Sequence, residues 1–503
     1  MANFKSLAKD TAIYGLSSII GRFLNYLLVP LYTYRISAAS GGYGVITNIY
    51  AYTALLLVFL TYGMETTFFR FANKEGADPK KVFATVTRMV ASTSLLFIAL
   101  VFAFIGPLSG FMGYPDHPSW VWTMAIVVAL DAFQCILFAY LRYSNRPLKF
   151  AALKLLFIAL NIALNIVFFV LLPDLQEKSP ESVLRIYNPE VGVGYVFYIN
   201  LFCTAFTGLF FIKEMRAALF GNGGEGGYFD WKLIKSMLSY SWPILLLGIA
   251  GILNQTADKI LFPYLCKAED ASAQLGIYGA ASKIAMIMAM ITQAFRYAYE
   301  PFVFAGSKQR DSKETCAKGM KYFLIFTLLA FLCVIAYMDI LRYIIQGGYW
   351  EGLRVVPIVM AAEIMMGIYF NLSFWYKLTD KTVWGAVFSG AGCLVLILVN
   401  VLFVPRYGYM ACAWGGFCGY ATAMLLSYFV GRKYYPIDYP LGSMGAYVLI
   451  AAVLFAGMTA ANRLLGTLPA VLVNTVLLAL FAAYIIKKDF PLSGLPVIGR
   501  FFR

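Results

Sequence analysis

The stretch GLSSIIGRFLNYLLVPLY, residues 15–32, indicates the class of fold, because it is apolar enough to form the middle of a membrane-spanning helix. Arg22 lies at its centre, and Asn25 follows just under one turn later. The same apolar character extends over the 503 residues, of which 61% are hydrophobic and 13% are charged. Soluble domains are roughly 45–50% apolar and about 25% charged. The sequence therefore predicts an all-α integral membrane protein.

Apolar runs of this kind recur along the whole chain, and they lack the alternation of a membrane β-barrel. At the length needed to cross a hydrocarbon core they predict about fourteen transmembrane helices. Their approximate bounds are 11–33, 42–64, 82–107, 119–141, 148–172, 191–212, 236–264, 271–295, 319–341, 352–376, 382–404, 408–431, 443–465 and 467–486. A cleaved signal peptide is the alternative for the first run, but that run is long and is interrupted by Arg22 and Pro30.

The net charge of +15 comes from Lys and Arg residues spread thinly over the connections between the apolar runs. No basic domain interleaved with aromatic residues is present, so nucleic acid is not expected as a partner. Most of these cations lie on one side of the membrane if the N-terminus is inside, and the positive-inside rule then predicts that both termini are cytoplasmic. The eight cysteines form no CxxC pair and no Cys/His spacing, so no metal, cofactor or disulfide is expected.

Three separated pairs of segments match at a constant offset of 235 residues in the sequence. METTFFRFANK (64–74) resembles YEPFVFAGSK (299–308), which aligns Glu65 with Glu300. The same offset aligns YLRYSNRP (140–147) with WYKLTDKT (375–382), and Asn165 with Asn400. A repeat with an even number of spans enters the membrane twice in the same orientation, so the two copies are related by an axis along the membrane normal. We therefore predict an N-terminal lobe at 1–215, a cytoplasmic linker at 216–235, a C-terminal lobe at 236–432, and two further helices with a cytoplasmic tail at 433–503.

The glycine-rich stretch GNGGEGGYFD (221–230) lies in this linker. Its glycines alone would also fit a phosphate-binding loop. No Lys-Ser/Thr follows and no strand precedes it, so we interpret it as a flexible connection between the lobes.

Ionisable residues within the apolar runs identify the candidate site, since such groups are costly in a bilayer and usually face a protein-lined or watery interior. The cations predict a cavity for an anionic group such as pyrophosphate. The substrate-binding candidates are Arg22, Asn25, Arg88, Lys154, Lys283 and Arg296. The candidates for binding a coupling ion are Asp131, Asp258 and Glu363, and those for a gate at the cytoplasmic face are Glu65, Arg70 and Glu300.

Each group of candidates also has a simpler interpretation. Arg88 and Lys154 lie about two turns from the inner end of a span, from where a long side chain can reach water. Interior acids can neutralise neighbouring cations instead of binding a coupling ion, and Asp258 adjoins Lys259 near an outer span end. Arg296 and Glu300 have the spacing of a local helix pair.

Several stretches resemble one known family. They are TAIYGLSSIIGRFLNYLLVPLYT (11–33), YGVITNIYAYTALLLVFLTYGMETTFFRF (43–71), GIYFNLSFWYKLTDKT (367–382) and LVNVLFVPRYGYMACAWGGF (398–417). Together they resemble the Wzx-type polysaccharide and O-antigen repeat-unit flippases of the multidrug/oligosaccharidyl-lipid/polysaccharide (MOP) exporter superfamily. The likeness covers nearly the whole chain, including the arrangement of two six-helix lobes and two further helices.

This resemblance implies that the protein moves a polyprenyl-pyrophosphate-linked oligosaccharide between the leaflets of a bacterial inner membrane for surface polysaccharide biosynthesis. A cationic central cavity would hold the pyrophosphate, with Arg22 among its cations. The implied partners are the lipid-linked oligosaccharide, membrane lipids and a proton or sodium counter-ion. The sugar unit and the coupling ion stay open, and a monomer is the expected but undetermined oligomeric state.

Three other functions fit part of the pattern. A lipid II flippase would share the fold and the cationic cavity. A multidrug exporter of the same superfamily would usually have an acidic, aromatic pocket, which the list of cations argues against. An O-antigen polymerase or ligase, which is an enzyme, would need a large outer loop, but the longest outer connection, 173–190, is short. No nucleophile–base pair or metal set is apparent, so we do not expect an enzyme.

Overall fold

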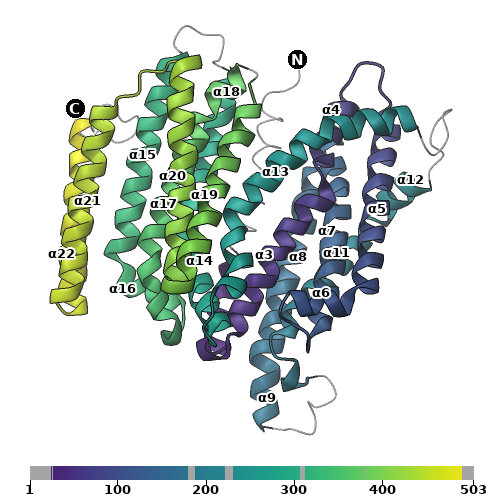
Figure 1. The fold of residues 1–503 in the computed structure, drawn as a ribbon, viewed down its shortest axis with the longest axis horizontal. Helices are drawn as coiled ribbons and strands as arrows, with labels where there is room; N and C mark the ends of the chain where they lie inside the picture. The colour runs from purple at the N-terminus through teal and green to yellow at the C-terminus, as the bar shows by residue number, and fades with distance from the viewer. Residues whose placement is uncertain are drawn as a thin grey trace. The chain divides into compact units, whose positions relative to one another are not determined.

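The structure is a computed structural model that describes residues 24, 26–178, 187–220, 230–305, 312–379 and 381–489, without the side chains of 297, 298, 300–302, 304, 305 and 312. Within these ranges the chain is helical and has no strand (Figure 1), which confirms the predicted all-α class. It forms two compact units: unit 1 comprises Met1–Gly279 and Ile397–Cys412, and unit 2 comprises Ala280–Leu396 and Ala413–Arg503.

Unit 1 is built around one central helix, α7. Its helices are α2 (Leu28–Arg35), α3 (Gly42–Thr61), α4 (Met64–Ala72), α5 (Pro79–Ala103), α6 (Ile105–Phe111), α7 (Pro118–Tyr143), α8 (Pro147–Ile166), α9 (Leu172–Lys178), α11 (Gly194–Leu209), α12 (Ile212–Leu219), α13 (Trp231–Leu265) and the first part of α14 (Ala271–Ala305). Helix α7 packs against α3, α5, α8 and α11. Its many fully buried Ala, Val, Ile and Leu side chains explain this central place.

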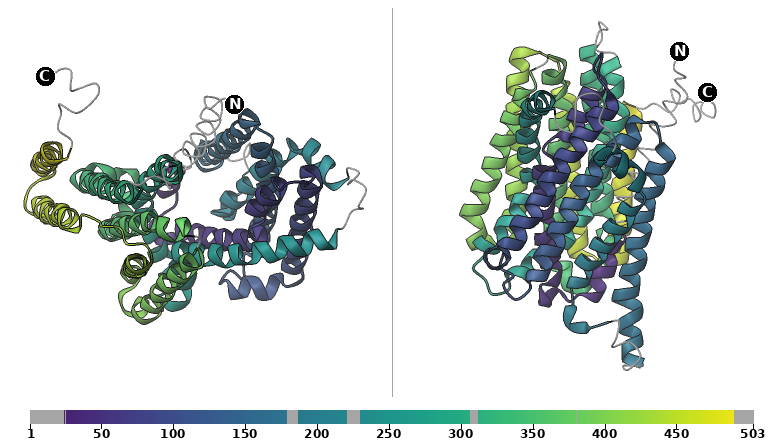
Figure 2. Two further views of the ribbon diagram at one scale, coloured as in Figure 1. Left: turned by 90° about the horizontal axis from the view of Figure 1, so that it is seen from above. Right: turned by 90° about the vertical axis from the view of Figure 1, so that its right-hand side faces the viewer.

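Helices α8 and α9 continue one another through a π-helical turn at Val167–Leu171. The result is one long rod that extends beyond the other helices of unit 1 (Figures 1 and 2). The sequence predicted a span at 148–172, so the turn lies inside that span and α9 extends the helix beyond it, to Lys178.

Unit 2 contains the rest of α14 and the helices that follow it. These are α15 (Ser312–Ala336), α16 (Met338–Leu341), α17 (Val356–Leu372), α18 (Phe374–Leu378), α19 (Val383–Tyr407), α20 (Tyr409–Tyr434), α21 (Leu441–Leu464) and α22 (Thr467–Lys488). Helices α19 and α20 each contribute one end to unit 1. Helix α15 packs against α17, α21 and α22. At the end of α22, the carboxylate of Asp489 pairs with Lys321 of α15 and accepts a hydrogen bond from Tyr447 of α21.

Eleven helices within the described ranges are long and apolar enough to cross a membrane, or twelve if the pair Gly194–Leu209 and Ile212–Leu219, bent by 70°, is one span. The chain is therefore a multi-pass membrane protein. The predicted span at 11–33 is described only near its end, where α2 lies. Helix α20 corresponds to the predicted span at 408–431 but is less apolar than the other spans, because glycine, alanine and tyrosine make up much of it.

The limits of the two compact units fall inside α14, α19 and α20. They follow the packing of the chain and do not correspond to the predicted ranges 1–215 and 236–432. The two lobes, their linker and their relation by an axis along the membrane normal therefore stay predictions.

Candidate functional site

A cavity of about 370 Å³ lies within unit 1 and is lined by α3, α4, α7, α8 and α11. Its polar lining consists of Glu65, Asp131, Gln134, Cys135, Arg142, Lys154, Thr204 and Thr207. Its apolar lining consists of Leu57, Phe138, Phe150 and Phe157. The structure thus brings together three predicted residues from separate spans, namely Glu65, Asp131 and Lys154.

Helix α7 contributes most of the polar lining. Asp131, Cys135, Phe138 and Arg142 are spaced three or four residues apart, so they lie on one face of the helix. The opposite faces of α7 are apolar and pack into unit 1. Sequence reasoning found Asp131 but missed the cavity role of Gln134 and Cys135. Their helical spacing from Asp131 in an otherwise apolar run was the signal that identifies them.

An ion pair joins α4 to α7 at one part of the cavity. The guanidinium of Arg142 pairs with the carboxylate of Glu65. The thiol of Cys135 donates to the other carboxylate oxygen, Oε2, at 3.0 Å. The Arg142 guanidinium also lies over the ring of Phe69, 5.2 Å from its centroid. Glu65 is therefore held by two groups of α7, and its role in a gate at the cytoplasmic face stays a prediction.

Asp131 and Lys154 are the second acid and the second cation of the cavity. Asp131 is hydrogen-bonded to Thr204, and Lys154 is its nearby cation. The ammonium of Lys154 lies over the ring of Phe138, 4.2 Å from the centroid, a favourable cation–π position. The cavity thus contains two acids and two cations. Of the residues predicted to bind substrate, only Lys154 lines this cavity, so the predicted cationic substrate cavity stays a prediction.

Two buried donors of the cavity are available to a ligand. The hydroxyl of Thr207 and the Nε of Arg142 are buried and have no hydrogen-bond partner within the described residues. Thr207 is 2% exposed. Buried donors of this kind normally have a partner, so these two atoms favour binding of a polar ligand or ion here.

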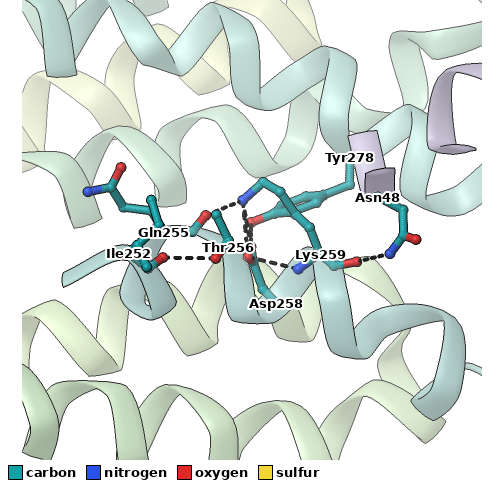
Figure 3. A network of polar contacts seen from close by, with 7 residues as sticks. All are labelled: Asn48, Ile252, Gln255, Thr256, Asp258, Lys259 and Tyr278. Carbon is teal, nitrogen blue, oxygen red and sulfur yellow. Dashed lines mark hydrogen bonds and ion pairs between the residues drawn. The ribbon is translucent and has the colours of Figure 1, made fainter. Parts of the chain in front are cut away.

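Asp258 belongs to a separate network in unit 1 (Figure 3). Its carboxylate accepts hydrogen bonds from Lys259 Nζ at 3.0 and 3.1 Å and from the hydroxyl of Tyr278 at 2.6 Å. The Lys259 carbonyl in turn accepts a hydrogen bond from Asn48 at 2.8 Å. These contacts join α3, α13 and α14 and occupy the Asp258 carboxylate, so we interpret Asp258 as part of a structural junction. Asp131 lines the interior cavity instead and is the better candidate for binding a coupling ion.

The remaining candidates lie elsewhere. Arg22 and Asn25 lie outside the described residues, as does the side chain of Glu300. Arg88 lies on α5, partly buried and outside the lining of the cavity. In unit 2, Lys283 on α14 and Glu363 on α17 are partly buried, and the exposed Arg296 lies 5.2 Å over the ring of Phe370. Their roles stay predictions.

The apolar helices and the polar cavity that unit 1 encloses define a multi-pass membrane protein of the transporter type. Residues 7–298 match the profile of a family described as polysaccharide biosynthesis protein, and the chain belongs to this family. It is also 19% identical, over 440 residues, to the uncharacterized membrane protein YabM of Bacillus subtilis (strain 168), covering 82% of this chain and 79% of that protein.

Solved transporter structures share the fold. A lipid II flippase, MurJ, in an inward closed conformation matches with a TM-score of 0.70 at 12% identity, covering 94% of this chain and 98% of that one. An inward-facing multidrug resistance transporter of the MATE family, from the MOP superfamily, matches with a TM-score of 0.62 at 15% identity, covering 84% and 94%. The chain therefore has the MOP fold, which confirms the resemblance found in its sequence.

Proposed function

We propose that this protein flips a polyprenyl-pyrophosphate-linked oligosaccharide from the cytoplasmic to the periplasmic leaflet of a bacterial inner membrane, by alternating access. The observation that carries the proposal is the match to the polysaccharide biosynthesis family over residues 7–298. The fold by itself is shared with drug exporters, whereas the family concerns polysaccharide assembly. A transporter of this type uses no chemical step, so no catalytic residue is assigned.

The physical task is to move a charged pyrophosphate through a medium of low dielectric constant, where an uncompensated anion is prohibitively costly. Cations inside the protein lower this cost. Lys154 is the described cation best placed for it, because it lies at a polar cavity and is stacked on Phe138. Arg22 and Asn25 are proposed to act with it, on the strength of the sequence alone.

The pair Asp131–Lys154 supports a specific form of ion coupling. While Asp131 is ionised, it compensates the charge of Lys154. When a proton or a sodium ion binds to Asp131, that compensation is lost and Lys154 attracts an anionic headgroup more strongly. Ion binding therefore favours substrate binding, and ion release favours substrate release.

The experiment is leaflet exchange of candidate lipid-linked oligosaccharides in liposomes that contain the purified protein. Asp131→Asn should lower the exchange rate by roughly tenfold, equivalent to about 1.4 kcal/mol, and should remove its dependence on pH and sodium. Lys154→Gln should lower the rate to a similar extent, while Lys154→Arg should retain part of it. Asp116→Asn, at an exposed position outside the cavity, is the matched control. Unchanged exchange and ion dependence in Asp131→Asn would show that Asp131 is structural.

A lipid II flippase is the second candidate function, because the MurJ structure matches 94% of the chain. The two functions differ in the glycan that is carried. Exchange of lipid II and of polysaccharide repeat-unit lipids should therefore be compared in the same liposomes. Transport of lipid II alone would replace the first proposal with the second.

A further inference from the structure

A second pocket in unit 1, of about 800 Å³, lies where α4 ends and α13 begins. Its lining differs sharply from that of the interior cavity, because its charged residues are all cations. The lining residues are Arg70, Phe71, Lys74, Lys232, Lys235, Ser236, Ser239 and Tyr240. We call this site the basic pocket.

Aromatic contacts hold one cation of the basic pocket in place. The guanidinium of Arg70 lies over the ring of Tyr240, 4.1 Å from its centroid. Phe71 packs edge-on against the same ring at 6.1 Å. Stacking fixes the plane of the guanidinium and leaves its N–H edge available, and this edge matches the oxygens of a phosphate in bidentate fashion. The hydroxyls of Ser236 and Ser239 lie one turn apart on α13 and add two further donors.

Within the described ranges, no ion pair involves any of the four cations of the basic pocket. Asp230 caps the N-terminus of α13, and this carboxylate is already engaged. It accepts from the N–H of Leu233 at 3.0 Å and pairs with Lys81 at 3.0 Å. These two contacts hold the pKa of Asp230 below its ordinary value. Asp230 therefore stays ionised at neutral pH, but its carboxylate contacts Lys81 and the N-terminus of α13 instead of the cations of the basic pocket.

Helix stability does not explain the two lysines at the start of α13. Lys232 and Lys235 lie in its first turns, where the helix dipole disfavours cations. Their position costs the helix a small amount of stability, and a bound anion nearby would offset that cost. The cytoplasmic location predicted for this end of α13 also favours lysines there.

The level of the basic pocket in the membrane points to a lipid. Trp231 begins α13 and is 74% exposed, and the helix itself is long and apolar enough to span the bilayer. An exposed tryptophan beside lysines at the end of a span is typical of the membrane–water interface. This pattern favours a place for the basic pocket at the depth of the lipid headgroups.

We propose that the basic pocket binds the phosphate of a lipid headgroup in the leaflet where α13 begins, which the predicted topology identifies as the cytoplasmic one. Two lipids carry this chemistry there: an anionic phospholipid such as phosphatidylglycerol, and the polyprenyl pyrophosphate of a lipid-linked sugar. The proposal rests on the pocket itself and does not depend on the proposed transport function.

Native mass spectrometry of the detergent-purified full chain tests the proposal. The probes are phosphatidylglycerol, undecaprenyl pyrophosphate, zwitterionic phosphatidylcholine and inorganic phosphate. The variant Arg70→Gln/Lys235→Gln should weaken binding of the preferred anionic lipid by about ten- to thirtyfold, given roughly 1 kcal/mol for each cation near a lipid surface. Phosphatidylcholine should bind weakly to every form of the protein.

The matched control is Lys80→Gln/Lys213→Gln, which changes the net charge equally. Its two exposed lysines lie at the starts of α5 and α12 and do not line the pocket. Lys74→Gln/Lys232→Gln is a second test pair that preserves the stacking of Arg70 on Tyr240, in case the first variant folds poorly.

Preference for phosphatidylglycerol or for the pyrophosphate would identify the source of the lipid. Equal lipid binding by pocket and control variants, or displacement of the lipid by equimolar inorganic phosphate, would overturn the proposal.

Discussion

At the scale of the residue, Asp131 and Asp258 show how surroundings separate two acids that look alike in the sequence. Both lie in apolar runs. Asp258 accepts hydrogen bonds from Lys259 and Tyr278, whereas Asp131 lies in a cavity with Thr204 and Lys154. The sequence predicted that both are candidates, but it could not rank them. The ranking depends on Tyr278 and Thr204, which are distant in the chain and are brought close only by the fold.

A buried hydrogen bond between Tyr32 and Asn165 should stabilise the contact of α2 with α8. The Tyr32 hydroxyl donates to Asn165 Oδ1 at 2.8 Å, and both side chains are buried. Tyr32→Phe and Asn165→Leu should each lower the free energy of unfolding, because each leaves a buried polar group without its partner. A double-mutant cycle should give a coupling of about 0.6–1.7 kcal/mol, the range seen for hydrogen bonds between membrane helices.

The cycle is measured by reversible unfolding in mixed micelles. Tyr407→Phe is the control, since its side chain is 59% exposed, and it should change stability by less than about 0.5 kcal/mol. A coupling of zero would mean that the hydroxyl of Tyr32 contributes packing only.

At the scale of the element, the break between α3 and α4 is what turns Glu65 toward the cavity. The chain has positive φ at Tyr62 (31°) and Gly63 (72°), so the helix stops and restarts at Met64. A Cβ at Gly63 would lie 2.9 Å from the side chain of Ile244 on α13. Gly63→Ala should therefore destabilise the protein by more than the roughly 1–2 kcal/mol cost of a left-handed residue.

Gly76 provides a matched control for this substitution. Its φ is 73°, but a Cβ there would meet nothing within 4 Å. Gly76→Ala should therefore show the backbone cost alone, and the difference in melting temperature between the two variants measures the contact with Ile244. Equal melting temperatures would show that α13 adjusts to the added methyl group.

The elements differ in how far the sequence could predict them. Long apolar runs such as that of α7 predict a span from composition, because the bilayer itself imposes the length. The predicted span at 42–64 ends at the break near Gly63, but the restart of the chain as helix α4 was not predicted. The π-helical turn at Val167–Leu171 was not predicted either. It lies inside an apolar run, and a change of helix type there leaves hydropathy unchanged.

At the scale of the whole molecule, the family and the fold could be predicted from the sequence. Both depend on the succession of apolar runs and on resembling stretches spread over the entire chain. The residues of the interior cavity could be predicted only in part. Its acids and Lys154 were identified as unusual for a membrane, but the pairing of Glu65 with Arg142 joins residues from separate helices. Arg142 was not among the predicted site residues, because it lies just beyond the predicted span at 119–141.

The distribution of charge over the whole chain predicts that the N-terminus, the stretch 221–229 and the C-terminus are cytoplasmic, and that the turn containing His117 is outside. Alkaline phosphatase inserted at His117 should therefore be active, while green fluorescent protein inserted after Glu225 or fused after Arg503 should fluoresce. Exchanging the two reporters at each site should abolish both signals. The reverse pattern would put the basic pocket at the outer leaflet, where a substrate made in the cytoplasm could not reach it before transport. The topology thus decides whether the lipid in that pocket can be an incoming substrate.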